Sequence, residues 1–405
     1  MNSHIKPVTA FGSRLLICAA AAASFTTCAV ADTGVSDQID STRFNVNSDE
    51  AVYGSSSLYH LYVSTLGSDS GTGSEGDPFK TIQKASSVAK PSTTIHVAAG
   101  TYNGNVVTSA SGTADGRIIF LYKGKPKWGA KIVGTGTEIM WTNNGSYVDI
   151  IGFDVTGPGR LGILNYGSHT TIAHSHVHNL AVSGGCTGNG GAGILNGSYS
   201  ASDNDIISNV VHDIGQLGAC NQVQGIYHSN LRGHVFNNIV YRASSWGIHL
   251  WHAANNVVVA NNTVFANGSA TMGGGMVIGA GDSPGGIVLD YTKVINNILY
   301  NNPNVGFMEY CNAGDNCIGS HNTVANNLVN GSARPIIMKV GVDVDTIAED
   351  PLFKDYQADG SGNYRLRKDS PAVDNGTADS APTQDINKVV RPRGAGFDIG
   401  AYESH

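Results

Sequence analysis

A pair of short apolar segments recurs through the middle of the chain, and this repeat constrains the fold more than any other feature. One unit is an apolar–Asn–apolar segment, and it occurs at Ile172–Asn179, Ile206–Asp213, Val235–Arg242, Val258–Asn267, Val294–Asn302 and Val324–Asn330. The other unit is a glycine followed by alternating apolar residues, and it begins at Gly162, Gly193, Gly225, Gly247, Gly275 and Gly306. Steps of 22 to 32 residues between these glycines fit the coils of a parallel β-helix, with insertions lengthening some loops.

The composition agrees with an all-β solenoid. The chain has 405 residues, of which 41% are apolar and 14% charged, so it is too apolar to stay disordered. Its 52 glycines follow no G-X-Y period and come with only 12 prolines, which excludes collagen. In stacked coils, inward Val, Ile and Leu are buried, and asparagines at the bends hydrogen-bond from coil to coil. The one good helical candidate, Ile82–Lys90, is expected to cap the N-terminal end of the stack.

The first 31 residues have the pattern of a secretory signal peptide. Lys6 and Arg14 precede the apolar run Leu15–Phe25, and Ala29–Ala31 supplies the small residues of a cleavage site. Removing this segment lowers the net charge from −7 to −9, because it holds two basic and no acidic residues. We therefore expect a soluble secreted or periplasmic protein that has neither nucleic acid nor an anionic membrane as a partner.

Four cysteines remain after the signal peptide, and an even number in an oxidising compartment indicates disulfides. Cys186 lies seven residues before Gly193 and Cys220 five before Gly225, so both belong to equivalent loops of adjacent coils. The predicted bridges are Cys186–Cys220 between coils and Cys311–Cys317 within a loop. The predicted parts of the chain are a signal peptide (1–31), an N-terminal extension (32–58), the β-helix (59–348) and a C-terminal capping segment (349–405).

The segments that flank the repeat resemble those of a known superfamily. Leu61–Ala85 and Ile95–Tyr102 lead into the first coils, and Glu349–Gly376 and Arg391–Glu403 follow the last. They resemble the opening and closing segments of secreted right-handed parallel β-helix proteins of the pectate-lyase-like superfamily. The resemblance implies a right-handed β-helix that binds or cleaves an acidic polysaccharide, by β-elimination or by hydrolysis.

Candidate chemistry follows from comparing the glycine-led segments position by position. If Ile163, Ile194, Ile226, Ile248, Met276 and Phe307 point inward, the next residues point outward. That outward column reads Leu164, Leu195, Tyr227, His249, Val277 and Met308. Its two polar members fall on neighbouring coils, and Trp251 shares their face. This arrangement predicts a proton-transfer pair beside an aromatic platform for a sugar ring; the alternative is a solvated surface pair without a function.

The asparagine-containing segments give two further columns. His178, His212, Tyr241, Phe265 and Tyr300 are expected to form a stacked aromatic ladder, while the next column is Asn179, Asp213, Arg242, Ala266 and Asn301. Asp213 and Arg242 would be neighbours able to form a charge-assisted pair. Because both precede loops that lead into the Tyr227 and His249 strands, they either border the same cleft or form a structural salt bridge.

These residues suit a polysaccharide lyase. β-Elimination needs a cation for the uronate carboxylate, a base and an acid, and Arg, His and Tyr meet these needs. The predicted catalytic residues are His249, Tyr227, Arg242 and His228, and the predicted substrate-binding residues are Trp251, His252, Asp213, His212 and Arg232. No lysine matches the base of several β-helix lyases.

The alternatives are a glycoside hydrolase or epimerase using Asp213 and Glu309, and a non-catalytic carbohydrate-binding surface protein.

The sequence assigns no certain cofactor. Nine histidines lie between His169 and His252, yet none has the H-E-x-x-H spacing of a zinc site, and most are expected in ladders or turns. Calcium is the other candidate, but its carboxylate ligands would come from the scattered residues Asp203, Asp205, Asp213 and Glu309. The expected partner is an acidic polysaccharide, and the expected state is a monomer.

Overall fold

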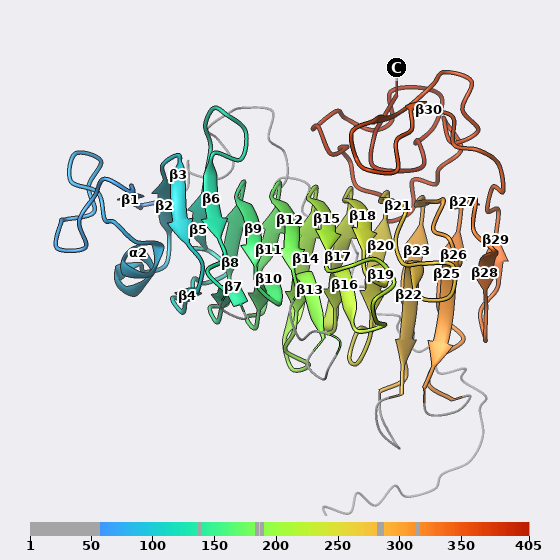
Figure 1. The fold of residues 1–405 in the computed structure, drawn as a ribbon, viewed down its shortest axis with the longest axis horizontal. Coiled ribbons are helices and arrows are strands. Elements are labelled where there is room, and N and C mark those ends of the chain that lie inside the picture. The colour runs from blue at the N-terminus through green and yellow to red at the C-terminus, as the bar shows by residue number, and fades with distance from the viewer. Residues whose placement is uncertain are drawn as a thin grey trace, which may run out of the picture. The chain divides into compact units, whose positions relative to one another are not determined.

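The computed structural model describes residues 57–136, 139–182, 186, 190–281, 287–312 and 316–404. The predicted signal peptide (1–31) and nearly all of the predicted extension (32–58) lie outside the described residues. Three parallel sheets run through the described chain, and each coil from β2 to β28 contributes one strand to each sheet (Figure 1). This arrangement is the right-handed parallel β-helix predicted from the repeat.

The first sheet contains one strand from each successive coil. Its strands are β1 (Tyr59–Val63), β2 (Thr93–Val97), β5 (Ile118–Leu121), β8 (Val148–Ile151), β11 (Thr171–Ala173), β14 (Ser202–Ile207), β17 (Leu231–Phe236), β20 (Val257–Ala260), β23 (Lys293–Ile295), β26 (Thr323–Ala325) and β29 (Asp343–Val344).

The second sheet is made from the strands that follow the first bend of each coil. They are β3 (Gly100–Asn103), β6 (Ala130–Val133), β9 (Asp154–Pro158), β12 (His176–Ala181), β15 (Val210–Ile214), β18 (Ile239–Ala243), β21 (Thr263–Phe265), β24 (Ile298–Tyr300) and β27 (Leu328–Asn330).

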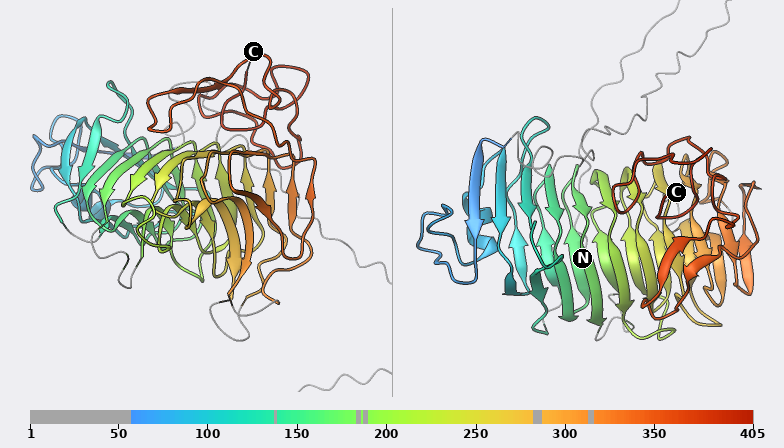
Figure 2. Two further views of the ribbon diagram at one scale, coloured as in Figure 1. Left: turned by 45° about the vertical axis from the view of Figure 1, so that its right-hand side comes forward. Right: turned by 90° about the horizontal axis from the view of Figure 1, so that it is seen from above.

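The third sheet collects the glycine-led strands and completes each coil (Figure 2). Its strands are β4 (Val106–Thr108), β7 (Ile139–Asn143), β10 (Leu161–Asn165), β13 (Gly191–Asn196), β16 (Val223–His228), β19 (Trp246–Leu250), β22 (Gly274–Ala280), β25 (Val305–Cys311) and β28 (Arg334–Ile337).

The predicted register of the third sheet is confirmed. Ile163, Ile194, Ile226, Ile248, Met276 and Phe307 are all buried in the core between the sheets. The outward column is also paired in the predicted order, from Leu164 through Tyr227 and His249 to Met308. Successive side chains of a strand point to opposite faces of the sheet. The register therefore fixes which side chains reach the surface.

Buried asparagines fill the bend between the first and second sheets. Their amides hydrogen-bond from coil to coil in the series Asn209, Asn238, Asn262, Asn297 and Asn327. Each side chain also donates to a first-sheet carbonyl of the preceding coil, as Asn262 does to Val235 O at 2.8 Å. The predicted asparagine ladder is thus confirmed, and it satisfies polar groups that would otherwise be buried at a cost.

The predicted helix is confirmed as α2 (Ile82–Val88), which buries Ile82 and Ala85 against the core. The Thr81 hydroxyl accepts a hydrogen bond from the Lys84 N–H at 3.1 Å and caps the first turn. The helix ends two residues before the predicted boundary at Lys90. Pro91 explains this difference, because a proline disfavours helical geometry in the residue before it. Among the described residues, no helix has the length and apolar character needed to cross a membrane.

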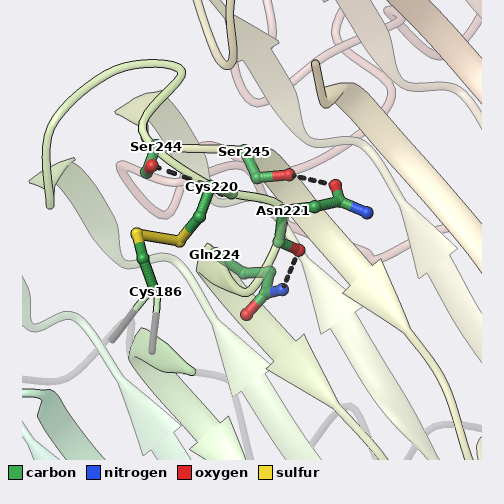
Figure 3. The surroundings of a disulfide bond; sticks show 6 residues. All are labelled: Cys186, Cys220, Asn221, Gln224, Ser244 and Ser245. Atoms are coloured by element: carbon green, nitrogen blue, oxygen red, sulfur yellow. Dashed lines mark hydrogen bonds between the residues drawn. A yellow bond between two sulfur atoms is a disulfide. The ribbon is translucent and has the colours of Figure 1, made fainter. Parts of the chain in front are cut away.

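Both predicted disulfides are present. The Cys186–Cys220 bridge joins equivalent loops of adjacent coils, and Cys311–Cys317 closes a short loop after β25. Around the first bridge, the Ser245 hydroxyl donates to the Asn221 side-chain oxygen at 2.7 Å, and the Gln224 amide donates to the Asn221 carbonyl at 3.2 Å (Figure 3). The bridge therefore belongs to a hydrogen-bonded loop rather than to an isolated link.

The C-terminal residues cover part of the second sheet. After β29, the described chain adds no further strand to the three sheets, and it forms the antiparallel pair β30 (Phe353–Asp355) and β31 (Asn363–Leu366). Apolar side chains of this segment pack on the outer face of β18 to β27, with Phe353, Tyr364 and Ile399 against Tyr241, Phe265 and Tyr300. A buried Arg391–Glu403 ion pair of 2.6 Å fixes the end of the segment.

Candidate active site

Tyr227 and His249 form a stacked pair at the centre of the outer face of the third sheet. They are register partners on β16 and β19, and both point outward because Ile226 and Ile248 before them point into the core. Their ring centroids lie 4.7 Å apart, and the ring planes differ by 7°. The neighbours in the column are Leu195 and Val277, so the pair is flanked by apolar side chains rather than by charges.

Four more aromatic side chains surround this pair. Trp251 meets His249 edge-on at 5.4 Å, and Tyr310 stacks on Trp251 at 5.7 Å. His252 lies 5.9 Å from Tyr227, and its Nε2 is 2.9 Å from the Tyr199 hydroxyl. We call this set the aromatic face; its members are Tyr199, Tyr227, His249, Trp251, His252 and Tyr310. The structure thus brings the predicted residues Trp251 and His252 to the predicted pair.

Two members of the aromatic face, Tyr199 and Tyr310, were not predicted from the sequence. Tyr310 lies two residues beyond Met308 and pairs in register with Gly279, so extending the outward column by one position would have found it. Tyr199 belongs to the loop before β14, and nothing in the repeat places that loop over the third sheet. Both side chains are exposed, at 41% for Tyr310 and 57% for Tyr199. They are available to contact a ligand that lies on the face.

Gly279 makes room for the Trp251 ring. A side chain at this position would overlap the six-membered ring of Trp251, which lies directly over the glycine backbone. Trp251 can therefore lie against the strand between His249 and Tyr310. The close approach of ring and backbone explains why a glycine stands at this point of an otherwise apolar strand.

Burial keeps His249 in its neutral form. Loss of solvent, together with a smaller electrostatic contribution from His252, lowers the pKa of His249 to about 3. Its Nδ1 atom is buried and has no hydrogen-bond partner. An imidazole in this state offers an unprotonated nitrogen at neutral pH, which a proton-transfer residue requires.

Arg242, Asp213 and His212 lie on the outer face of the second sheet instead. The predicted charge pair is confirmed, since Arg242 Nε and Asp213 Oδ1 are 2.5 Å apart. Asp213 Oδ2 also lies 2.7 Å from Nδ1 of His212. Burial raises the pKa of Asp213, but these two hydrogen bonds outweigh it and leave the pKa below its usual value. Because β15 and β18 precede the bend into the third sheet, these side chains do not stand beside Tyr227 and His249, and Arg242 does not belong to the aromatic face.

His228 and Arg232 also lie apart from the aromatic face. His228 points inward, where its Nδ1 is 3.1 Å from the Asn196 amide and its Nε2 is 3.0 Å from the Asn230 carbonyl. It extends the interior ladder of Asn143, Asn165 and Asn196 and has no route to a substrate. Arg232 is the second residue of β17 in the first sheet and pairs with Asp203 at 2.7 Å. The predicted catalytic role of His228 and the predicted binding role of Arg232 are therefore not retained.

Replacing His228 by asparagine should protect the protein against acid. Burial lowers the pKa of His228 to about 4. Between pH 6.5 and pH 4, this histidine is therefore protonated in the unfolded chain but neutral in the folded chain, and the free energy of unfolding falls as the pH falls. Asparagine matches the rest of the ladder and does not titrate. From pH 7 to pH 4, we expect the His228→Asn variant to lose roughly 3 kcal/mol less stability than the wild type. Urea unfolding at both pH values measures this difference, and equal losses would contradict the role assigned to His228.

Asp213 and Glu309, the two carboxylates of the hydrolase alternative, do not lie close together. Glu309 points into the core with 1% of its surface exposed, and its Oε2 accepts hydrogen bonds from the backbone N–H groups of Lys339, Val340 and Gly341. Asp213 lies on the second sheet. Hydrolysis needs two carboxyl groups on either side of one bond. The prediction that Asp213 and Glu309 share a site is therefore wrong.

Comparisons with known proteins confirm the fold. No protein-family model and no curated protein matches the chain. Among solved structures, pectate lyase Pel9A matches over 88% of this chain and all of its own, with 17% identity and a TM-score of 0.55. An alginate lyase from Paenibacillus sp. str. FPU-7 matches over 66% of this chain and 96% of its own, with 17% identity and a TM-score of 0.44. The resemblance to pectate-lyase-like β-helix proteins is thus established for the architecture.

Proposed function

We propose that this protein is an exported enzyme that cleaves a uronic-acid-containing polysaccharide by β-elimination on the aromatic face. The observation that carries the proposal is the stacked Tyr227–His249 pair on the outer face of the third sheet, in which burial keeps the imidazole neutral. The pectate-lyase fold supports an action on polysaccharides. Two disulfides support export, because such bonds persist in oxidising compartments.

The aromatic face supplies the groups that the reaction needs. Flat aromatic side chains such as Trp251 and Tyr310 present apolar surface on which a sugar ring can lie. His249 would accept the proton from the carbon beside the uronate carboxylate, and the Tyr227 phenol would donate a proton to the leaving oxygen. His252, which lies beside Tyr227, would pair with the carboxylate. The proton taken and the proton given balance, and the product carries a new double bond.

The test is a product assay. Purified protein is incubated with a panel of uronate polymers, including polygalacturonate and alginate, and both ultraviolet absorbance and reducing ends are followed. β-Elimination predicts that the absorbance of unsaturated uronate rises together with new reducing ends on at least one polymer. Reducing ends without that absorbance would show hydrolysis and overturn the proposal. Binding of a polymer without any product would overturn the proposal and favour a non-catalytic carbohydrate-binding protein.

A further inference from the structure

Three histidines gather on the outer face of the second sheet, away from the aromatic face. His176 and His178 are alternate residues of β12 and therefore point to the same side, and His212 on β15 is the register partner of His178. Each offers a ring nitrogen, and these nitrogens lie within 4.8 Å of one another. We call these residues the histidine cluster.

Two carboxylates hold the rings of the histidine cluster. Oδ1 of Asp154 on β9 lies 2.9 Å from Nδ1 of His176 and 2.9 Å from Nε2 of His178. Oδ2 of Asp213 lies 2.7 Å from Nδ1 of His212. An ionised carboxylate can only accept hydrogen bonds, so each of these three ring nitrogens carries a proton.

The same hydrogen bonds leave two unprotonated nitrogens facing each other. In neutral imidazoles, a proton on Nδ1 means a lone pair on Nε2. Nε2 of His176 and Nε2 of His212 are only 2.8 Å apart. Two lone pairs at this distance repel each other unless a positive charge lies between them, which is either a proton in an N–H···N hydrogen bond or a metal ion. A histidine whose far nitrogen donates to a carboxylate is also the usual arrangement of a metal ligand.

We propose that His176, His178 and His212 bind a divalent transition-metal ion of the Zn²⁺ class, with Asp154 and Asp213 orienting the ligands. Imidazole suits zinc, copper, nickel and cobalt, whereas calcium prefers oxygen ligands. Bonds of about 2.0–2.1 Å to zinc would need the two Nε2 atoms to separate to roughly 3.3 Å. His178, whose ring is stacked on His176 at 3.9 Å, completes the set by turning about its Cβ–Cγ bond.

The surroundings give an ion access and shape the site. The side chains of His176, His178 and His212 are 19%, 16% and 13% exposed, so solvent reaches the cluster. Trp128 stacks on His176 at 4.4 Å, and Tyr241 stacks on His212 at 4.5 Å. Each of the two carboxylates also forms an ion pair with a basic side chain. Lys131 Nζ lies 3.8 Å from Asp154, and Arg242 pairs with Asp213. Three protein ligands leave a fourth position open to water or a ligand.

The primary test is metal binding by the full-length protein after treatment with a chelator. Zinc chloride is titrated calorimetrically, and cobalt chloride is titrated by visible absorbance, which reports tetrahedral coordination. We expect one ion per chain in the wild type and at least a 100-fold weaker affinity in His176→Ala and His212→Ala. His178→Ala should have a smaller effect, about tenfold, because its ring has to turn first. Failure of the wild type to bind a stoichiometric ion would overturn the proposal.

Two further variants keep the test independent of folding. Asp213→Asn retains all three histidines but removes the carboxylate, and we expect a 10–100-fold loss of affinity. His60→Ala is the matched control, since Nδ1 of His60 and Nε2 of His96 also lie 3.0 Å apart on the first sheet and belong to no cluster of three ligands among the described residues. This control should bind the ion as the wild type does. A loss in His60→Ala equal to that in His212→Ala would contradict the assigned location.

Tryptophan fluorescence provides a location test that does not depend on affinity. Bound Co²⁺ should quench Trp128, because its ring lies against the His176 ligand. The Trp128→Phe variant should still bind one cobalt ion but lose most of the quenching. If quenching persists in full in Trp128→Phe, the ion lies elsewhere and the proposal fails.

Discussion

Replacing His249 by alanine is expected to abolish turnover while leaving the β-helix folded. General acid–base groups contribute about 10²–10⁴-fold to rate, and we expect kcat/KM on the polymer identified by the product assay to fall by that factor. The fold should survive because the side chain lies on the outside of β19, whereas Ile248 and Leu250 hold the strand in the core. Tyr227→Phe removes only a hydroxyl group, and we expect a comparable loss of activity from it.

A matched histidine on the first sheet provides the control. His96 stacks on Tyr62 with centroids 4.8 Å apart and ring planes 20° apart, so it repeats the Tyr227–His249 arrangement on another face. We expect His96→Ala to keep wild-type activity. Undiminished activity in His249→Ala, or an equal loss in His96→Ala, would remove the aromatic face as the site of reaction. Circular dichroism and thermal unfolding show whether each variant is folded.

The pH dependence should identify the same residue. A base must be unprotonated, and burial lowers the pKa of His249 to about 3. Activity that depends on its neutral form should therefore persist as the pH falls below 6.5, the usual pKa of histidine, and decline only toward pH 3. The acidic limb of kcat/KM against pH measures this directly. A limb near pH 6.5 would assign the titrating group to a solvated histidine instead of His249.

The repeat made most of the fold predictable, because a β-helix depends on local alternation and on neighbouring coils only. Once the glycines aligned the strands, the outward position of Tyr227 and His249 followed, and so did the Cys186–Cys220 bridge. The same alternation places His228 inside, directly after an outward residue. The error in its assignment came from grouping residues by their closeness in sequence rather than by strand parity.

The misplaced residues share a physical cause. A bend separates β18 from β19, so Arg242 and His249 are seven residues apart yet belong to different sheets. The direction in which a bend turns the chain depends on backbone angles such as the positive φ of Asp213 and Arg242, which the sequence pattern does not specify. The histidine cluster could not be predicted from the sequence for a related reason. Its spacing in sequence matches no metal motif, because its ligands meet only through the pairing of β12 with β15.

The asparagine ladder should be the most sensitive element of the fold, and Asn262→Ala tests it. Oδ1 of Asn262 accepts the backbone N–H of Asn238 at 2.9 Å, and its Nδ2 donates to Asn297 Oδ1 at 2.9 Å and to Val235 O at 2.8 Å. Asn297 Oδ1 still accepts the backbone N–H of residue 262, but alanine leaves the Asn238 N–H and the Val235 carbonyl of the preceding coil without this partner. Each buried group left without a hydrogen bond costs about 1–3 kcal/mol.

We expect Asn262→Ala to lower the free energy of unfolding by roughly 3 kcal/mol or more, measured by urea denaturation. The control is Asn144→Ala, which makes the same chemical change at an exposed position. That variant should stay within about 0.5 kcal/mol of the wild type. Because each ladder asparagine binds its neighbours in the preceding and following coils, the loss should spread along the stack, and Asn262→Ala should unfold less cooperatively than the wild type. Equal stabilities of the two variants would mean that water or a rearranged bend replaces the ladder, and that coil-to-coil cohesion rests on the apolar core alone.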